Sequence, residues 1–379
     1  MTTDPALRLL RDLVAINSIN PALAPGAPGE AEIADAVAAE LRRAGLDVQM
    51  QHPAAGRPNV IGVLEGRREG RTLLFCGHLD TVGVAGMAGP FEPVERDGRV
   101  YGRGAHDMKG GVAAMIDAAR TIAATGGLPS GRLVVAAVAD EEHASIGAEA
   151  LVAEWTADAA VVTEPTGLAI AVGHKGFAWV EVEVSGRAAH GSRPTEGEDA
   201  ILRMGRVLRH LEALDGDLQA RQPHVRLGTA SLHASFIEGG RELSSYPDRV
   251  VLRMERRTLP GEPATVALDE VQSILDGLRL DDATFRAGAR GIFGRPPYEI
   301  SPDHELPRAL GAVLRHFGAA AAMEGVSFWT DAAVLGSAGI PSIVFGPGGA
   351  GLHSTEEYVN TADVVLCRDA LAELARRFC

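Results

Sequence analysis

The fold of this chain is indicated by residues 71–80, RTLLFCGHLD, in which a short apolar run ends at a histidine and an aspartate. A brief apolar run bounded by charge and glycine is typical of a buried strand in a parallel sheet. In open α/β sheets, ligands bind outside the carboxyl ends of the strands. His78 and Asp80 therefore mark one point on the rim of a predicted ligand site.

Further runs of the same kind alternate with helical patterns along the chain. Strands are predicted at 59–64, 71–76, 132–139, 159–163 and 342–345, and helices at 7–15, 30–44, 111–124, 145–154, 306–317 and from 361 onward. This alternation predicts an α/β fold in which helices cover both faces of a mostly parallel sheet.

The pattern changes between residues 175 and 292. From Phe177 to Ser185, valines alternate with glutamates, as in a half-buried antiparallel strand. Helices are predicted at 199–214 and 263–278, and strands at 177–185, 229–237, 249–255 and 283–289. This β-α-β-β-α-β order is ferredoxin-like. We therefore expect a catalytic domain at 1–174 and 293–379, interrupted by an inserted α+β domain at 175–292.

Composition and charge narrow the class of protein. The 379 residues carry a net charge of -14, which argues against binding nucleic acid or an anionic membrane and favours a small-molecule substrate. Residues 1–5 lack the basic and apolar character of a leader, and no apolar run approaches a membrane span. Three widely spaced cysteines fit a reducing compartment. A cytoplasmic protein is expected.

Carboxylates and imidazoles follow four of the predicted strands where each strand ends, and Asp107 lies in a glycine-rich stretch just before a predicted helix. The set consists of His78, Asp80, Asp107, Glu141, Glu142, Glu164 and His353. Such mixed ligands suit zinc or a similar divalent ion with room for an activating water. Taken singly, each residue has an ordinary alternative, such as a hydrogen-bonded histidine, a turn aspartate or a solvated acidic turn. The set as a whole indicates a two-metal hydrolase, in which the Asp80 carboxylate orients the His78 ring.

Five longer motifs contain these residues, and a sixth surrounds His190. They are Gly77–Val82, Gly102–Gly111, Asp140–Glu142, Thr163–Thr166, Gly186–Ser192 and His353–Glu357. With them the sequence resembles, from its first helix to its last, the co-catalytic zinc family of aminoacylases, acetylornithine deacetylase, succinyl-diaminopimelate desuccinylase and carboxypeptidase G.

The resemblance implies a specific metal site. Asp107 would bridge two divalent ions, one also held by His78 and Glu164 and the other by Glu142 and His353. Zinc is the expected metal, with cobalt or manganese as alternatives. Glu141 would be the general base. The resemblance also implies a cis peptide bond after Asp107.

The resemblance further assigns residues of the inserted domain. His190 would reach the active site of a neighbouring subunit and stabilise the oxyanion, which implies a homodimer formed through this domain. Arg257 would bind the substrate carboxylate. Ser244 occupies the position at which family members usually have asparagine, so one polar contact to substrate is shortened or lost.

The leading functional hypothesis is a metal-dependent amidohydrolase that removes the acyl group of an N-acyl amino acid, as acetylornithine deacetylase does. A carboxypeptidase or dipeptidase with the same site is the alternative. A binding protein that has lost its chemistry is disfavoured because every metal position and Glu141 are intact. A two-metal phosphatase or nuclease is disfavoured by the acidic charge and by Arg257.

Overall fold

The computed structural model describes residues 4–84 and 86–379. These form two compact units. The first unit comprises the described residues up to Gly173, together with Ile300–Gly325 and Thr330–Cys379, and the second unit comprises His174–Glu299 and Val326–Trp329. The prediction that residues 1–5 do not form a leader concerns Met1–Thr3 in part, and these three residues lie outside the described ranges.

The first unit is built on a mixed sheet whose centre is parallel. Its strands, in spatial order, are β1 (Asp47–Ala54), β2 (Arg57–Glu65), β6 (Arg132–Val138), β3 (Thr72–His78), β7 (Ala159–Val162), β15 (Ser342–Val344) and β8 (Ile170–His174), with β14 (Met323–Val326) also paired to β8. Strands β6, β3, β7 and β15 are parallel neighbours, whereas β1, β2 and β8 pair antiparallel. The parallel centre places the ends of four strands at one edge.

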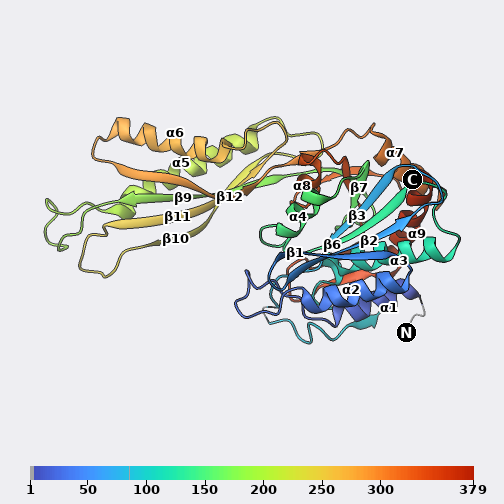
Figure 1. Ribbon diagram of the computed structural model, residues 1–379. Helices are drawn as coiled ribbons and strands as arrows, with labels where there is room; N and C mark the ends of the chain where they lie inside the picture. The colour runs from blue at the N-terminus through green and yellow to red at the C-terminus, as the bar shows by residue number, and fades with distance from the viewer. Residues whose placement is uncertain (1–3, 85) are drawn as a thin grey trace. The chain divides into compact units, whose positions relative to one another are not determined.

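Helices cover both faces of this sheet (Figure 1). They are α1 (Pro5–Val14), α2 (Ala31–Arg43), α3 (Gly110–Ala124), α4 (Ile146–Glu154), α7 (Glu305–His316), α8 (Ala332–Ser337) and α9 (Thr361–Phe378). Helices α4 and α8 pack together on one face, while α3 contacts α1, α2 and α9 on the other. The predicted α/β class is confirmed. None of the helices in the described ranges has both the length and the apolar character that a membrane crossing requires.

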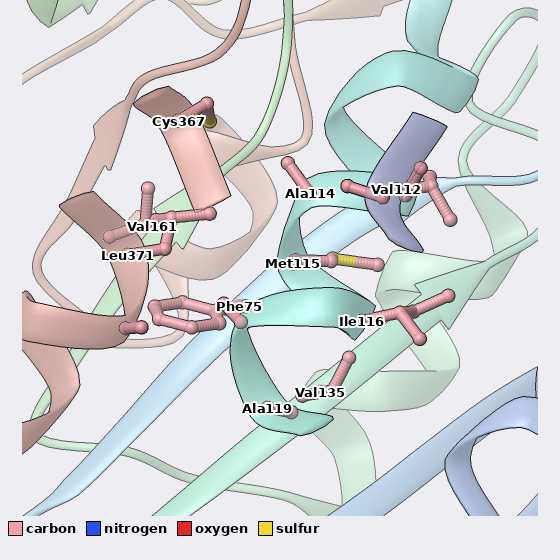
Figure 2. Packing of buried hydrophobic residues seen from close by; sticks show 14 of the residues in the cluster. Phe75, Val112, Ala114, Met115, Ile116, Ala119, Val135, Val161, Cys367 and Leu371 are labelled. Carbon is pink, nitrogen blue, oxygen red and sulfur yellow. The ribbon is translucent and has the colours of Figure 1, made fainter. Parts of the chain in front are cut away.

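The core lies between α3 and the parallel strands. Figure 2 shows Met115 of α3, Phe75 of β3, Val161 of β7 and Leu371 of α9 among the residues of this buried cluster. All seven residues of β3 are buried, because helices cover both of its faces. The strand ends that carry polar side chains are therefore anchored in the packed core.

A small sheet joins two segments that are distant in sequence. Its order is β16 (Gly349–Ala350), β17 (Tyr358–Asn360), β5 (Arg99–Tyr101) and β4 (Val94–Arg96). Val359 pairs with Val100, both fully buried. The loop that precedes β17 is therefore placed beside the segment that follows β5.

The second unit has the predicted β-α-β-β-α-β order. Its elements are β9 (Gly176–Ser185), α5 (Ala200–Ala220), β10 (Ser231–Gly239), β11 (Arg249–Thr258), α6 (Val266–Asp281) and β12 (Arg286–Arg295), followed by the short β13 (Tyr298–Glu299). The antiparallel sheet runs β10-β11-β9-β12. Val180, Val182 and Val184 of β9 are buried against α5 and α6, as the alternation in the sequence predicts. The unit is a ferredoxin-like α+β fold.

Candidate metal centre

The first unit brings all the predicted metal ligands together. His78 is the last residue of β3, and Glu164 lies two residues after β7. Glu142 follows β6 by four residues. Asp107 lies just before α3, where its peptide bond to Met108 is cis, and His353 lies between β16 and β17. Three ligands thus come from the parallel sheet, and two come from segments joined through the small sheet.

Asp107 lies between the two imidazoles. Its Oδ1 is 3.1 Å from Nε2 of His78, and its Oδ2 is 3.3 Å from Nε2 of His353. Each carboxylate oxygen therefore faces a different histidine. This is the arrangement that a carboxylate shared by two cations requires.

Glutamates complete two groups of ligand atoms around this centre. Glu164 Oε1 is 3.5 Å from Nε2 of His78, and Glu141 Oε2 is 4.0 Å from the same nitrogen. Glu142 Oε2 is 3.1 Å from Nε2 of His353. Two metal-sized groups follow from these positions, one formed by His78, Glu141 and Glu164 and one by His78, Asp107 and Glu142. Glu141 is thus close enough to bind a metal, and its assignment as a base rests on chemistry beyond these distances.

Burial and mutual repulsion perturb the acids of the site. Burial, together with the neighbouring Glu164, raises the pKa of Glu141 well above its usual range. Burial and Asp107 raise the pKa of Glu142 to about 7. Burial also raises the pKa of Glu164, with His78 opposing. Because like charges are packed in a dry site, a divalent cation among them would remove the repulsion.

In Asp107 and His353 the surroundings instead favour the charged form. Burial acts to raise the pKa of Asp107, but hydrogen bonds with His353 and His78 outweigh it and hold that pKa below its usual range. Hydrogen bonds to Asp107 and Glu142 raise the pKa of His353 to about 10. The carboxylates therefore attract positive charge at this point.

The donor set fits divalent cations. Ligands at about 2.0–2.2 Å from a tetrahedral ion lie about 3.3–3.6 Å from one another. Four pairs of candidate ligand atoms are separated by 3.1–3.5 Å. Within the part of the chain that the structure describes, Glu142 Oε1 is buried and has no hydrogen-bond partner. A bound cation would give this oxygen a partner and would supply Lewis acidity and an activated water.

Asp80 organises the backbone behind the ligands. The Nδ1 atom of His78 lies 2.9 Å from the backbone carbonyl oxygen of Asp80 and 3.7 Å from its carboxylate. The carboxylate instead accepts the backbone N–H groups of Glu141 at 3.1 Å and Glu142 at 3.2 Å. The ring-orienting contact that sequence analysis gave to the carboxylate is thus made by the Asp80 carbonyl. The Asp80 carboxylate thereby helps to hold residues Asp140–Glu142, the acidic segment, in place.

Glu357 is a supporting residue that sequence reasoning missed. It is fully buried, and its carboxylate accepts the N–H groups of Gly104, His106 and Asp107 at 2.9–3.0 Å. It also accepts from Arg103 Nη1 at 2.6 Å. Glu357 therefore ties the loop of Asp107 to the loop of His353. The motif His353–Glu357 contains Glu357 and could have pointed to it, but nothing in the sequence distinguishes Glu357 from its exposed neighbour Glu356.

Two glycines allow the chain to approach Glu164 closely. A Cβ at Gly346 would lie 2.3 Å from the carbonyl oxygen of Glu164, and one at Gly111 would lie 1.9 Å from that of Thr163. No side chain fits at such distances, so glycine is required at both positions. The glycine loop after β15 thus packs against the backbone that carries Glu164, a predicted metal ligand.

The remaining predicted site residues belong to the second unit. His190 and Ser244 are neighbours there, because Gly191 N–H donates to the Ser244 carbonyl at 2.7 Å. The exposed His190 ring pairs through Nδ1 with Ser192 Oγ at 2.8 Å. Arg257 lies on β11, where its Nε contacts Glu255 at 2.7 Å. The roles that sequence analysis gave to these three residues remain predictions.

Known proteins resemble the whole chain. Residues 74–377 match the model of peptidase family M20/M25/M40. An acetylornithine deacetylase of Myxococcus xanthus is 32% identical over 100% of this chain and 98% of its own length. An acetylornithine deacetylase of Pectobacterium atrosepticum is 29% identical, with 100% and 99% covered.

Solved structures share the fold at lower identity. A tripeptidase from Staphylococcus aureus has a TM-score of 0.83 at 21% identity, with 99% of this chain and 98% of that chain covered. A dinuclear metal-binding peptidase from Bacillus subtilis has a TM-score of 0.75 at 16% identity, with 98% and 97% covered. The family match spans most of the chain, and the ligand cluster lies within it. The chain therefore belongs to peptidase family M20/M25/M40 and is a metal-dependent hydrolase of amide bonds.

Proposed function

We propose that the protein removes the acyl group from the amino nitrogen of an N-acyl amino acid. The observation that carries this proposal is the ligand cluster around Asp107 in a chain that is 32% identical, over its full length, to an acetylornithine deacetylase. The cluster provides the means to hydrolyse an amide, and the relative indicates which class of amide. Peptide hydrolysis at the same site is the competing outcome that the experiment below separates.

Five residues hold the cations in this proposal. Asp107 is shared, His78 and Glu164 complete one site, and Glu142 and His353 complete the other. Zinc is proposed as the metal, with cobalt and manganese as alternatives, because carboxylate and imidazole ligands suit all three ions. When bound, the cations supply an activated water and polarise the substrate carbonyl.

Glu141 is the proposed general base. It accepts a proton as the water oxygen bonds to the carbonyl carbon, and it returns that proton to the nitrogen as the C–N bond breaks, which leaves a carboxylic acid and a free amine. The raised pKa of Glu141, caused by burial and by Glu164, suits a group that must both accept and donate near neutral pH. The Asp80 carboxylate positions Glu141 by accepting a hydrogen bond from the backbone N–H of Glu141.

Substrate contacts are proposed for the second unit. Arg257 is proposed to bind the substrate carboxylate, and its guanidinium lies 5.6 Å from the ring centre of Phe177. Ser244 is proposed as a short polar contact to substrate, and His190 as the group that stabilises the oxyanion. We assign residues 175–292 as the dimerisation domain and the rest of the chain as the catalytic domain.

A homodimer through the second unit is part of the proposal. Strand β10 lies at the edge of its sheet, and its Phe236 and Ile237 are about half exposed. An edge strand with exposed apolar side chains favours pairing with another copy. We also propose a cytoplasmic location, because Cys76, Cys367 and Cys379 are free thiols.

The test combines metal analysis with hydrolysis of N-acetyl, N-succinyl and N-carbamoyl amino acids and of dipeptides. We expect two metals per chain and cleavage of acylated amino acids. Cleavage of dipeptides alone would reassign the protein as an exopeptidase. No metal and no turnover after addition of zinc, cobalt or manganese would contradict the proposal.

A matched pair of variants tests the base. Glu141→Gln should lower kcat by about 100-fold or more, the typical contribution of general base catalysis, and should leave the metal bound. Glu154→Gln, at an exposed position on α4, is the control and should keep full activity. Loss of metal in Glu141→Gln would instead assign Glu141 to the ligands.

A further inference from the structure

Three consecutive backbone N–H groups in the acidic segment are held by two buried carboxylates. Glu30 accepts the N–H of Asp140 at 3.1 Å. Asp80 accepts the N–H groups of Glu141 and Glu142, at 3.1 and 3.2 Å. The backbone from which the Glu141 and Glu142 side chains project is therefore held by the carboxylates of Glu30 and Asp80.

Asp140 begins this segment in an unusual conformation. Its φ is +70°, in the left-handed region that favours glycine. Its side chain explains how the conformation is kept, because Oδ1 accepts from Asn20 Nδ2 at 2.9 Å and Oδ2 accepts the N–H of Ala144 at 3.2 Å. Asn20 Nδ2 also donates to Asp80 at 2.8 Å. Asp140 and Asp80 are thus joined by one amide.

Arg57 offsets part of the negative charge of these carboxylates. Arg57 of β2 is 9% exposed, and its guanidinium forms a two-pronged pair with Glu30, which is fully buried at the start of α2. Its Nη2 also donates to Asp140 Oδ1 at 2.9 Å. Burial raises the pKa of Glu30 and the bond to Arg57 opposes that rise. Without Arg57, Glu30 and Asp140 would face each other as buried acids.

We propose that Arg57 and Glu30 are positioning residues that hold Glu141 in its working orientation. Neither touches the ligand cluster, so they act through the backbone of Asp140. Loss of Arg57 leaves Glu30 and Asp140 to repel each other, which releases Asp140 from its left-handed conformation and rotates Glu141 with it. The inference rests on the proposed role of Glu141, and it holds whether the substrate is an acyl amino acid or a peptide.

The primary test is Arg57→Met in the full-length enzyme, assayed on whichever substrate of the panel the wild type cleaves fastest. Loss of a supporting partner at a metal site typically costs about 10–100-fold. We expect kcat to fall by that factor, KM to change by less than about threefold, and two metals to stay bound. Arg57→Lys keeps the charge and should recover part of kcat.

Two further variants separate positioning from simple destabilisation. Glu30→Gln keeps the size of the side chain and leaves Arg57 paired with Asp140, so it should also lower kcat, with a smaller loss of stability than Arg57→Met. Arg368→Met is the matched control, because Arg368 is similarly buried and pairs with Asp117 at 2.9 Å in the same unit without any contact to the acidic segment. It should lower the melting temperature and leave kcat unchanged.

The deciding experiment is a double-mutant cycle on kcat. In a Glu141→Gln background, Arg57→Met should have little further effect, because the group it positions has already lost its function. An equal loss in both backgrounds, or a wild-type kcat in Arg57→Met, would overturn the inference. If the wild type cleaves only dipeptides, the proposed function is overturned, and the same double-mutant cycle is then measured with a dipeptide as substrate.

Discussion

Replacing Glu357 by alanine should loosen the metal centre and destabilise the first unit. Glu357 is fully buried and joins the loop of Asp107 to the loop of His353. The replacement removes one charged partner of Arg103, which is only 2% exposed, and it removes the acceptor for three backbone N–H groups. Both losses occur at the segment that positions Asp107, the proposed shared metal ligand.

The magnitude follows from these contacts. Removing one partner of a buried ion pair costs about 3–5 kcal/mol, because the other charge stays buried and unpaired. Each N–H that remains dry adds about 1–3 kcal/mol, and water that enters the new cavity reduces this sum. We therefore expect the free energy of unfolding to fall by about 5 kcal/mol, which is a large share of the 5–15 kcal/mol of a typical protein. Metal affinity should fall by about 10–100-fold.

Urea unfolding and competition with a chromophoric chelator measure the two quantities. Glu356→Ala is the matched control, because this neighbouring glutamate is exposed, and its effect on stability should stay within about 0.5 kcal/mol. Glu357→Ala with the same unfolding free energy and metal affinity as Glu356→Ala would refute the reasoning. A loss of stability without loss of metal affinity would show that Glu357 supports the fold and not the site.

Three other predictions concern separate parts of the molecule. Gly346→Ala should weaken metal binding by about tenfold, measured by titration calorimetry, because the new Cβ would meet the carbonyl of Glu164 at 2.3 Å; Gly277→Ala, with open space around it, is the control. Burial lowers the pKa of His174 to about 4, so between pH 6.5 and 4 this imidazole takes up a proton only in the unfolded chain. Stability should therefore be lost as pH falls through this window, by up to about 3 kcal/mol, and a smaller loss in His174→Phe, followed by urea unfolding, would confirm the source. His190→Ala should lower the rate of hydrolysis and leave metal content unchanged, whereas an unchanged rate would remove this residue from the mechanism.

The fold was predictable where a strand or helix shows a clear pattern of apolar and polar residues. The parallel strands β3, β6 and β7 are continuous apolar runs, and β9 alternates, so both periods were visible in the sequence. Strand β1 was missed because it lies at the edge of the sheet, mixes polar and apolar side chains and is nowhere fully buried. Helix α5 runs on to Ala220, beyond the predicted end at residue 214, because Leu218 is buried by tertiary packing.

The candidate metal ligands could be named from the sequence because their chemistry is rare and most of them follow strand ends. His78, Glu142 and Glu164 lie at or just after the ends of parallel strands. His353 follows β15 across a glycine loop, and Asp107 lies in a glycine-rich stretch just before α3. Their supports were not predictable. Glu357, Arg57 and Glu30 are common residue types with no pattern around them, and only the folded chain shows that they are buried beside the segments that carry the ligands.

By itself the sequence determined the α/β class, the ferredoxin-like second unit and the set of side chains that can hold two metals, because periodicity and residue chemistry are local properties. Only the tertiary structure decided which oxygen of Asp107 faces which histidine and which buried charges hold the acidic segment in place. Those facts depend on contacts between residues up to about 250 positions apart, such as Arg103 and Glu357. No local pattern encodes such a contact, because its energy exists only when the packed core brings the two segments together.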